Sequence, residues 1–112
     1  MQKLENSSPT ISLLVPVFDD DRIYRAIASA LSQNIPFDEI IIQSPTGKYR
    51  EVERLSQNIS VIAEPDRNLF HALDILIKHS KSEYLVMIGS DDFFLDSGFV
   101  ARAKTRLSKT GA

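Results

Sequence analysis

The sequence predicts an α/β fold, with a mainly parallel sheet of about four strands and helices on both faces. Four short apolar runs, most of them rich in Ile and Val, are each followed by a segment whose apolar residues recur at helical spacing. Strands that alternate with helices form parallel sheets, because each helix carries the chain back to the edge where the next strand starts. In addition, carboxylates follow the first and the last of the four runs.

Length and composition suit one small domain. The chain has 112 residues, of which 43% are hydrophobic and 25% are charged, an ordinary globular profile. We expect a flexible lead-in at residues 1–9, a single domain at 10–108 and a tail at 109–112. A net charge of −2 argues against nucleic acid as the main partner.

Two classes of structure are excluded by residue usage. The absence of cysteine excludes a disulfide framework and a thiolate metal site. No apolar run reaches the roughly 18 residues of a membrane span, and the polar N-terminus is unlike a signal peptide. A cytoplasmic location is therefore the expectation.

The first strand begins at Ile11 and is expected to end near Pro16, because proline cannot donate to the ladder of the sheet. One of the acidic residues at 19–21 is expected to cap the helix that follows. That helix ends near Gln33, since Pro36 prevents its return. Its apolar residues recur at helical spacing: Ile23, Ile27, Ala30 and Leu31.

The second strand is the β-branched run at 40–42, a composition typical of a central parallel strand. A turn cluster follows at 43–47. A second, short helix is predicted over 49–57, with Val52 and Leu55 facing the core.

The third strand is predicted at 59–62, and the fourth begins at Tyr84 as a buried parallel strand. Between them lies the strongest helical pattern of the chain, formed by Leu69, Phe70, Leu73, Leu76 and Ile77. A last amphipathic helix is indicated by Phe99, Val100, Ala103 and Leu107.

Two adjacent carboxylates, Asp91 and Asp92, come directly after Gly89 and Ser90. Asp disfavours strands, so the pair should lie just past the carboxyl end of the fourth strand, where open α/β sheets bind ligands. Carboxylate oxygens are the ligands that Mg²⁺ and Mn²⁺ take. The alternative is that one of the two caps the helix that begins near Gly98.

Strand order decides between these alternatives. In the 3-2-1-4 order of half a Rossmann sheet, the first and fourth strands are neighbours at the switch point. Their carboxyl ends then carry residues 18–20 and 91–92, so two acidic clusters far apart in the chain line one crevice. Capping gives no reason for this convergence, and a ligand site is therefore the stronger interpretation.

Over about residues 10–103, the sequence resembles the family 2 glycosyltransferases of GT-A fold. No single landmark is specific, but four of them occur in the correct order and spacing. The first landmark is Ile11 to Gln33, with its Pro-x-Phe strand end and the spacing of Ser29 and Gln33. The second is the strand at Phe37 to Ile42, and the third is Glu64-Pro-Asp-Arg. The fourth runs from Ser82-Glu-Tyr to Asp91-Asp92.

The resemblance implies that the chain binds a nucleotide-diphosphate sugar, with a UDP-sugar favoured, together with Mn²⁺ or Mg²⁺. The reaction implied is transfer of the sugar to a hydroxyl of a saccharide or other acceptor, with inversion suggested by the family. The cation would neutralise the departing diphosphate. No residue is a convincing general base, so the catalytic residue stays unassigned.

Matched position by position, the resemblance places Phe18 against the base, with the backbone of Pro16 and Val17 beside it. Asp19 or Asp20 stands where the family has an Asn-Glu pair near the nucleoside.

Three further positions concern the ribose, the metal and the phosphates. Asp91 would approach the ribose or the metal, and Asp92 would bind the metal that bridges the diphosphate. Arg67 would add positive charge near those phosphates.

The sequence departs from the family in three respects. Residues 43–45, Gln-Ser-Pro, replace an Asp-rich turn in which an Asp reads the base, although Ser44 can still form a hydrogen bond. Residues 74–76, Asp-Ile-Leu, replace the family's Asn-Lys-Gly. The chain also holds only the donor half, because these transferases need about a hundred further residues for the acceptor. We therefore expect no robust sugar transfer by the 112 residues alone.

Two other functions remain open. A non-catalytic or degenerate nucleotide-binding or assembly module fits the lost Asp and the missing half, and its apolar sheet edge would favour a homo-oligomer. A receiver-like phospho-acceptor domain is the remote alternative, with Asp66 and Ser90 as loose matches to its motif. That fold needs a fifth strand, which the pattern does not predict.

Overall fold

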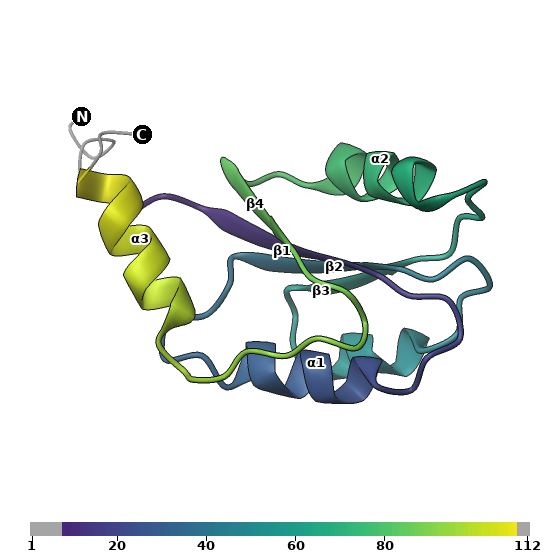
Figure 1. Cartoon of the computed structure of the whole chain (residues 1–112), viewed down its shortest axis with the longest axis horizontal. Helices are drawn as coiled ribbons and strands as arrows, with labels where there is room; N and C mark the ends of the chain where they lie inside the picture. Colours follow the sequence, from purple (N-terminus) through teal and green to yellow (C-terminus); the bar gives the residue numbers. More distant parts are fainter. Residues whose placement is uncertain (1–7, 110–112) are drawn as a thin grey trace.

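The computed structural model describes residues 8–109 (Figure 1). The expected lead-in at 1–9 and tail at 109–112 therefore lie largely outside the described residues. Figure 1 shows α2 on one face of a central sheet and α1 on the other, with α3 at one end. The α/β class with helices on both faces is confirmed.

The described elements follow the predicted alternation of strands and helices. None of the described helices has the length and apolar character needed to cross a bilayer. In chain order the elements are β1 (Ile11–Pro16), α1 (Ile23–Leu31), β2 (Glu39–Gln43), the 3₁₀ helix η2 (Arg50–Leu55), β3 (Ile59–Ile62), α2 (Leu69–His79), β4 (Tyr84–Met87) and α3 (Phe99–Lys109).

The four strands form one sheet in the order β3-β2-β1-β4, which is the half-Rossmann order considered from the sequence. All three pairings are parallel, with Leu13 opposite Ile40 in β2 and opposite Val86 in β4. The carboxyl ends of β1 and β4 are therefore neighbours. The described residues contain these four strands, so the fifth strand that a receiver-like domain requires is not among them.

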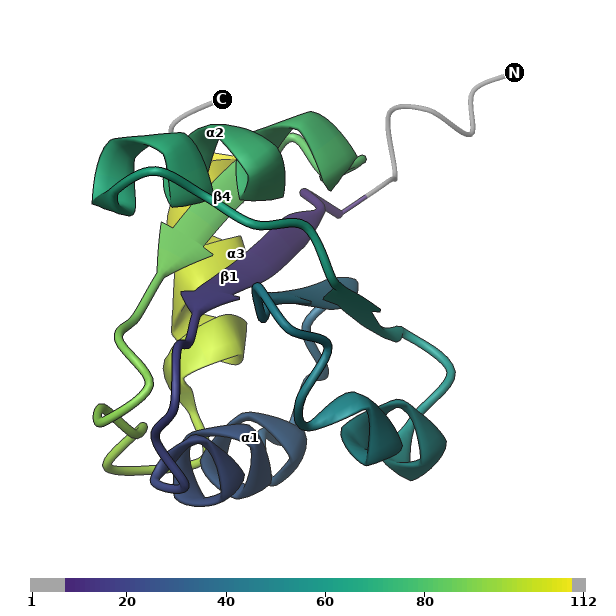
Figure 2. The same ribbon diagram turned by 90° about the vertical axis from the view of Figure 1, so that its right-hand side faces the viewer.

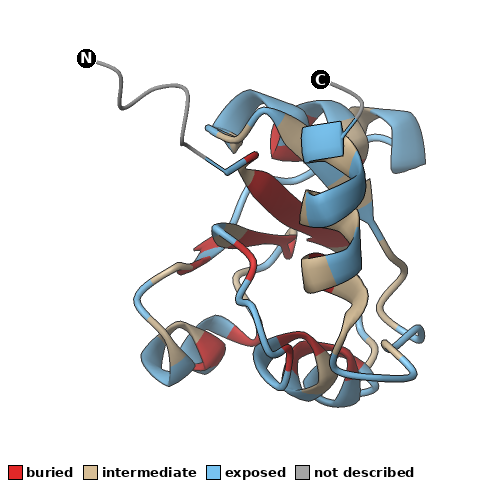
Figure 3. Ribbon diagram, turned by 90° about the vertical axis from the view of Figure 1, so that its left-hand side faces the viewer, coloured by how far each residue is buried: buried red, intermediate tan, exposed pale blue. Residues whose placement is uncertain are grey.

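The two central strands of the sheet, β1 and β2, are buried on both faces (Figure 3). On the larger face, Leu13 and Ile40 pack with Ile23 and Ile27 of α1. On the other face, Leu14 and Ile41 pack with Leu76 of α2. Continuous apolar runs thus reflect a sheet covered on both sides.

The predicted helix at 49–57 is wrong in type and extent. The structure has a single 3₁₀ segment at Arg50–Leu55, and Tyr49 before it adopts a left-handed conformation with φ of 74°. A residue in that conformation cannot begin an α-helix. Val52 is buried as predicted, whereas Leu55, at the end of the segment, is 60% exposed.

The expected acidic cap of α1 is also wrong. Arg22 occupies the cap position, and no side chain caps the helix. Asp20 instead accepts a hydrogen bond from the backbone N–H of Arg22, one residue before the helix begins. The acidic residues therefore shape the turn that leads into α1.

Burial of two elements differs from the sequence prediction. β4 is one of the two edge strands of the sheet, and its Leu85 and Met87 are half exposed rather than buried. In α2 the buried residues are Ala72, Ile75 and Leu76, whereas Leu69 and Phe70 of the predicted apolar pattern are exposed.

Candidate functional site

A cavity of about 330 Å³ lies at the carboxyl ends of the strands, within the size range of small-molecule sites. Its lining residues come from the ends of β1 and β2, from the connection between β3 and α2, from α2 itself, and from the segment after β4. Its lining comprises Pro16, Val17, Phe18, Gln43, Asp66, Leu69, Ala72, Gly89, Ser90 and Asp91. Four of the residues predicted from the sequence are thus brought together: Pro16, Val17, Phe18 and Asp91.

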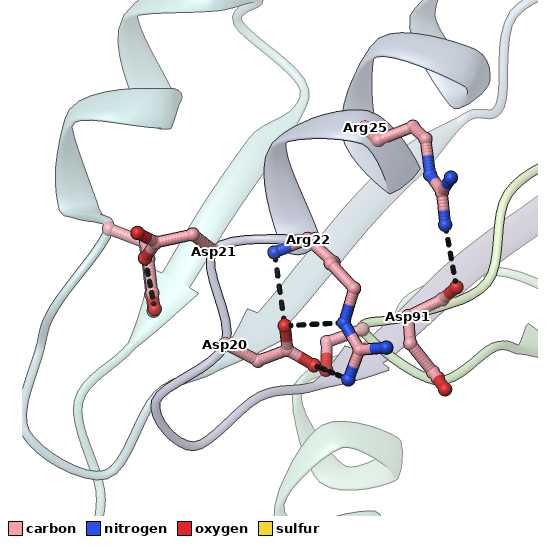
Figure 4. A network of polar contacts seen from close by, with 7 residues as sticks. Asp20, Asp21, Arg22, Arg25 and Asp91 are labelled. Carbon is pink, nitrogen blue, oxygen red and sulfur yellow. Dashed lines mark hydrogen bonds and ion pairs between the residues drawn. The ribbon is translucent and has the colours of Figure 1, made fainter.

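The segments that follow β1 and β4 run side by side below the sheet (Figure 2). The hydroxyl of Ser90 donates to Oδ2 of Asp20 over 3.0 Å. Arg25 of α1 donates to the backbone oxygen of Asp91 over 3.2 Å, as Figure 4 shows. The two acidic clusters therefore meet at one crevice, although 70 residues separate the bonded pair.

Asp20 is held in its charged form by Arg22. The guanidinium donates to both carboxylate oxygens of Asp20, over 2.9 and 3.1 Å (Figure 4). These side-chain hydrogen bonds, followed by the one from the Arg22 backbone, lower the pKa of Asp20 to about 2. The contact thus contributes at neutral pH and is lost only as the pH falls toward that value.

Arg22 also lies close to the second acidic cluster. The pKa of its guanidinium is raised, chiefly by the hydrogen bond to Asp20 and to a smaller extent by the charge of Asp91. Arg22 therefore places a positive charge beside the crevice, which favours an anionic ligand there.

Asp91 and Asp92 both turn back over Gly89. A Cβ at Gly89 would lie 2.9 Å from Oδ1 of Asp91, closer than real Cβ atoms come to a neighbour, and 3.2 Å from Oδ2 of Asp92, tighter than most real Cβ contacts. Oδ2 of Asp92 also accepts the Gly89 N–H over 2.8 Å. The missing side chain thus lets two carboxylates approach one point.

These two carboxylates fit a hard divalent cation by donor type. Among the described residues, no group of three or more His, Cys, Asp or Glu side chains is arranged to enclose a metal ion. Asp91 and Asp92 would thus supply part of a coordination shell, and oxygens of a ligand or water would complete it.

Gln43 and Asp66 line the cavity, although neither was singled out from the sequence as a ligand contact. Gln43 is 1% exposed at the end of β2, and its amide Nε2 donates to the Glu64 carbonyl and to Oδ2 of Asp66. The available signal was a polar residue directly after a β-branched run, where burial requires a hydrogen-bonded partner.

The remaining predicted residues lie outside the lining of this cavity. Asp19 forms an ion pair with Lys48. Ser44 is fully buried, and its hydroxyl has no hydrogen-bond partner among the described residues. The backbone N–H of Arg67 donates to His71 over 3.0 Å. Asp92 is exposed and adjoins the lining through Gly89 and Asp91.

Ser29 and Gln33 of α1 hold the segment that follows the acidic pair. The hydroxyl of Ser29 accepts the N–H of Phe94 over 2.9 Å. The amide of Gln33 donates to the Asp96 carbonyl and accepts the N–H of Val100, over 2.8 and 3.1 Å. The Ser-x-x-x-Gln spacing thus anchors the connection between β4 and α3 to α1.

Replacing Gln33 by Leu is expected to lower the free energy of unfolding by about 1–3 kcal/mol, because two backbone groups lose their partner at a buried position. Urea denaturation followed by circular dichroism measures the change. The matched control is Gln57→Leu at an exposed position, for which almost no change is expected. Equal effects of the two substitutions would contradict the anchoring role.

A larger cavity, of about 430 Å³, lies between β4 and α3. It is lined mainly by apolar side chains, together with Arg102 and Arg106, and includes no carboxylate. It also lies away from the carboxyl ends of the strands, where open α/β sheets bind ligands. The smaller, polar cavity is therefore the candidate site.

Comparisons with known proteins were made for sequence and for structure. The model of the family described as Glycosyl transferase family 2 matches residues 12–112. No curated protein matches the chain. Among solved structures, S. aureus TarS 1–349 is similar with a TM-score of 0.77 and 18% identity, over 89% of this chain and 32% of that chain.

A second similar structure is the mannosyltransferase PcManGT from Pyrobaculum calidifontis, solved with GDP-Man and Mn²⁺. Its TM-score is 0.77 and its identity is 19%, over 93% of this chain and 34% of that chain. TarS 1–349 in complex with UDP-GlcNAc gives a TM-score of 0.71 and 14% identity, over 89% and 31%. At these identities the structures show a shared fold, and this chain spans about a third of their length.

Proposed function

We propose that this chain, which belongs to glycosyl transferase family 2, binds a nucleotide-diphosphate sugar together with Mn²⁺ or Mg²⁺. Its sheet is the Rossmann-like half of a GT-A fold. The observation that carries the proposal is the convergence of Asp91 and Asp92 over Gly89 at the edge of the 330 Å³ cavity. A carboxylate pair at the carboxyl end of a parallel strand suits a cation and the diphosphate that accompanies it.

The walls of the cavity support a nucleoside beside this diphosphate. Phe18 is 75% exposed at the end of β1, a position where its ring can cover a base. Leu69 and Ala72 add apolar surface from α2. Similar structures have been solved with UDP-GlcNAc and with GDP-Man and Mn²⁺, which are ligands of the proposed class.

The cation, when bound, would neutralise the charge that develops on the leaving diphosphate. In this proposal Asp91 and Asp92 hold it, while Arg22 adds positive charge from the adjacent segment. Asp20 and Ser90 fix the position of that segment through their hydrogen bond.

Residues 10–108 form one donor-binding unit in this proposal, and the acceptor hydroxyl and the general base belong to another part of the active enzyme. The short span relative to similar structures supports this division.

Isothermal titration calorimetry of the chain with UDP tests the proposal. We expect binding that is about tenfold or more tighter with Mn²⁺ than with EDTA, because the cation links the carboxylates to the diphosphate. GDP and dTDP are titrated in the same way. A folded chain that binds none of the three nucleotides would refute donor binding and favour a non-catalytic assembly module.

A further inference from the structure

The candidate cavity has two polar ends. One end is formed by Asp91, after β4, and the other by Gln43 and Asp66, at the end of β2 and after β3. Because β1 lies between β4 and β2 in the sheet, about two strand spacings, or roughly 9.5 Å, separate the two ends. A diphosphate at the Asp91 end would therefore leave the other end for a more distant part of the same ligand.

The Asp66 carboxylate is fixed by a buried amide. Nε2 of Gln43 donates to Oδ2 of Asp66 over 2.9 Å and to the Glu64 carbonyl over 2.8 Å. The two acceptors hold the Gln43 amide in one orientation, and the Gln43 side chain is almost fully buried. Oδ1 of Asp66 forms no hydrogen bond in the described part of the chain, and Asp66 lines the cavity.

The space beside Asp66 suits a flat ring. Val17, Leu69 and Ala72 add apolar surface to the lining of the same cavity, and Phe18 adds an exposed aromatic side chain. Aromatic and apolar walls with one fixed polar group are typical of sites that bind a planar heterocycle.

We propose that Asp66, held by Gln43, determines the base of the donor by accepting the imide N–H of a uracil ring. This inference rests on the proposed function and goes further, since it names the residue that selects the base. It also explains how the cavity recognises a base although Gln43, Ser44 and Pro45 replace an acidic turn after β2.

The hydrogen-bond pattern favours the imide edge of uracil over cytosine and guanine. Uracil presents one N–H between two carbonyl groups, which matches one free carboxylate oxygen. Cytosine has an unprotonated nitrogen at the same ring position, and this nitrogen would repel Oδ1. Guanine presents two adjacent N–H donors, which suit a carboxylate with both oxygens free, whereas Oδ2 of Asp66 is already engaged by Gln43.

The substitution Asp66→Asn tests this pattern directly. Gln43 can still donate to the carbonyl oxygen of the new side chain, so the new NH₂ group would point to the base. A donor at that position repels the imide N–H of uracil and pairs with the ring nitrogen of cytosine. Affinity for UDP is expected to fall about 10- to 30-fold, and the preference for UDP over CDP is expected to reverse.

Calorimetric titrations with UDP, CDP and GDP in the presence of Mn²⁺ measure these affinities in the wild type and in Asp66→Asn. The matched control is Asp74→Asn, which removes an exposed carboxylate of α2 that pairs with Lys78, away from the cavity. Its UDP affinity and base preference should equal those of the wild type. Circular dichroism establishes that all three proteins are folded.

Each alternative result has its own meaning. Equal binding of UDP and CDP by the wild type, or an equal loss of both in Asp66→Asn, would overturn the role of Asp66 and leave donor binding intact. Tighter binding of GDP than of UDP would overturn the choice of uracil. A wild-type chain that binds no nucleotide would overturn this inference together with the proposed function.

Discussion

Replacing Asp92 by Asn is expected to lower the affinity for UDP in the presence of Mn²⁺ by about tenfold or more, because the cation that links the carboxylates to the diphosphate loses a charged ligand. The amide carbonyl of the new side chain can still accept the Gly89 N–H, so the local turn is kept. What the substitution removes is one of the two negative charges that converge over Gly89. Calorimetry with UDP, with Mn²⁺ and with EDTA, measures the loss.

The control for this experiment is Asp96→Asn in the same connection between β4 and α3. Asp96 pairs with Arg102 at the surface and accepts the Gly98 N–H, a bond that an Asn carbonyl can replace. Exposed ion pairs contribute little, so affinity and stability should stay close to wild type. If Asp92→Asn keeps its dependence on Mn²⁺, the cation is held by other groups and the assignment of Asp92 fails.

Replacing Phe37 by Ala is expected to lower the free energy of unfolding by about 3–5 kcal/mol. Phe37 is 2% exposed, and its ring lies 5.4 Å from that of Phe94 and 6.3 Å from that of Phe99. The substitution opens a void between α1, the sheet and the segment that carries the acidic pair. Urea denaturation followed by circular dichroism measures the change.

Phe70→Ala is the matched control for size and residue type. Phe70 is 81% exposed on α2, so its truncation should change the free energy of unfolding by less than about 0.5 kcal/mol. A similar loss in both variants would show that the three-ring cluster around Phe37 adds no specific stability. A loss in Phe37→Ala that also weakens UDP binding would show that the cluster positions the site.

The strand order was predictable because each strand carries a continuous apolar run and each connection is helical or short. Ile11–Pro16 and Glu39–Gln43 lie at the centre of the sheet and are buried on both faces, which is the condition that such runs reflect. Right-handed parallel crossovers then leave few topologies, and the observed order is the common one.

Burial at the sheet edge was less predictable. The run at Tyr84–Met87 resembles a central strand in sequence, but no strand covers its outer edge among the described residues. The residue pattern of a strand shows how apolar the strand is, but it does not show how many other strands pair with it. The segment at Arg50–Leu55 has the residue pattern of a short helix, whereas the structure has a 3₁₀ helix there, preceded by the left-handed residue Tyr49.

The candidate site was partly predictable. The end of β1 and the acidic pair after β4 are local signals, because strand ends and carboxylates can be recognised in the sequence. The contact between Gln43 and Asp66 spans 23 residues and depends on how the connection after β3 folds back onto β2. Nothing in the sequence indicates that Gln43 and Asp66 are in contact, so only the structure shows that they form one unit.

A sheet with only parallel pairings has consequences for how the chain folds and how a ligand stabilises it. No pair of strands can form through a hairpin, and the bonds between Thr10 and Glu83 must join residues 73 apart. Such long closures slow folding. The crevice between β1 and β4 exists only after the last of them has formed, so a nucleotide bound there acts on the global unfolding equilibrium. At a ligand concentration of 100 times its Kd, the chain should gain about 2.7 kcal/mol of stability.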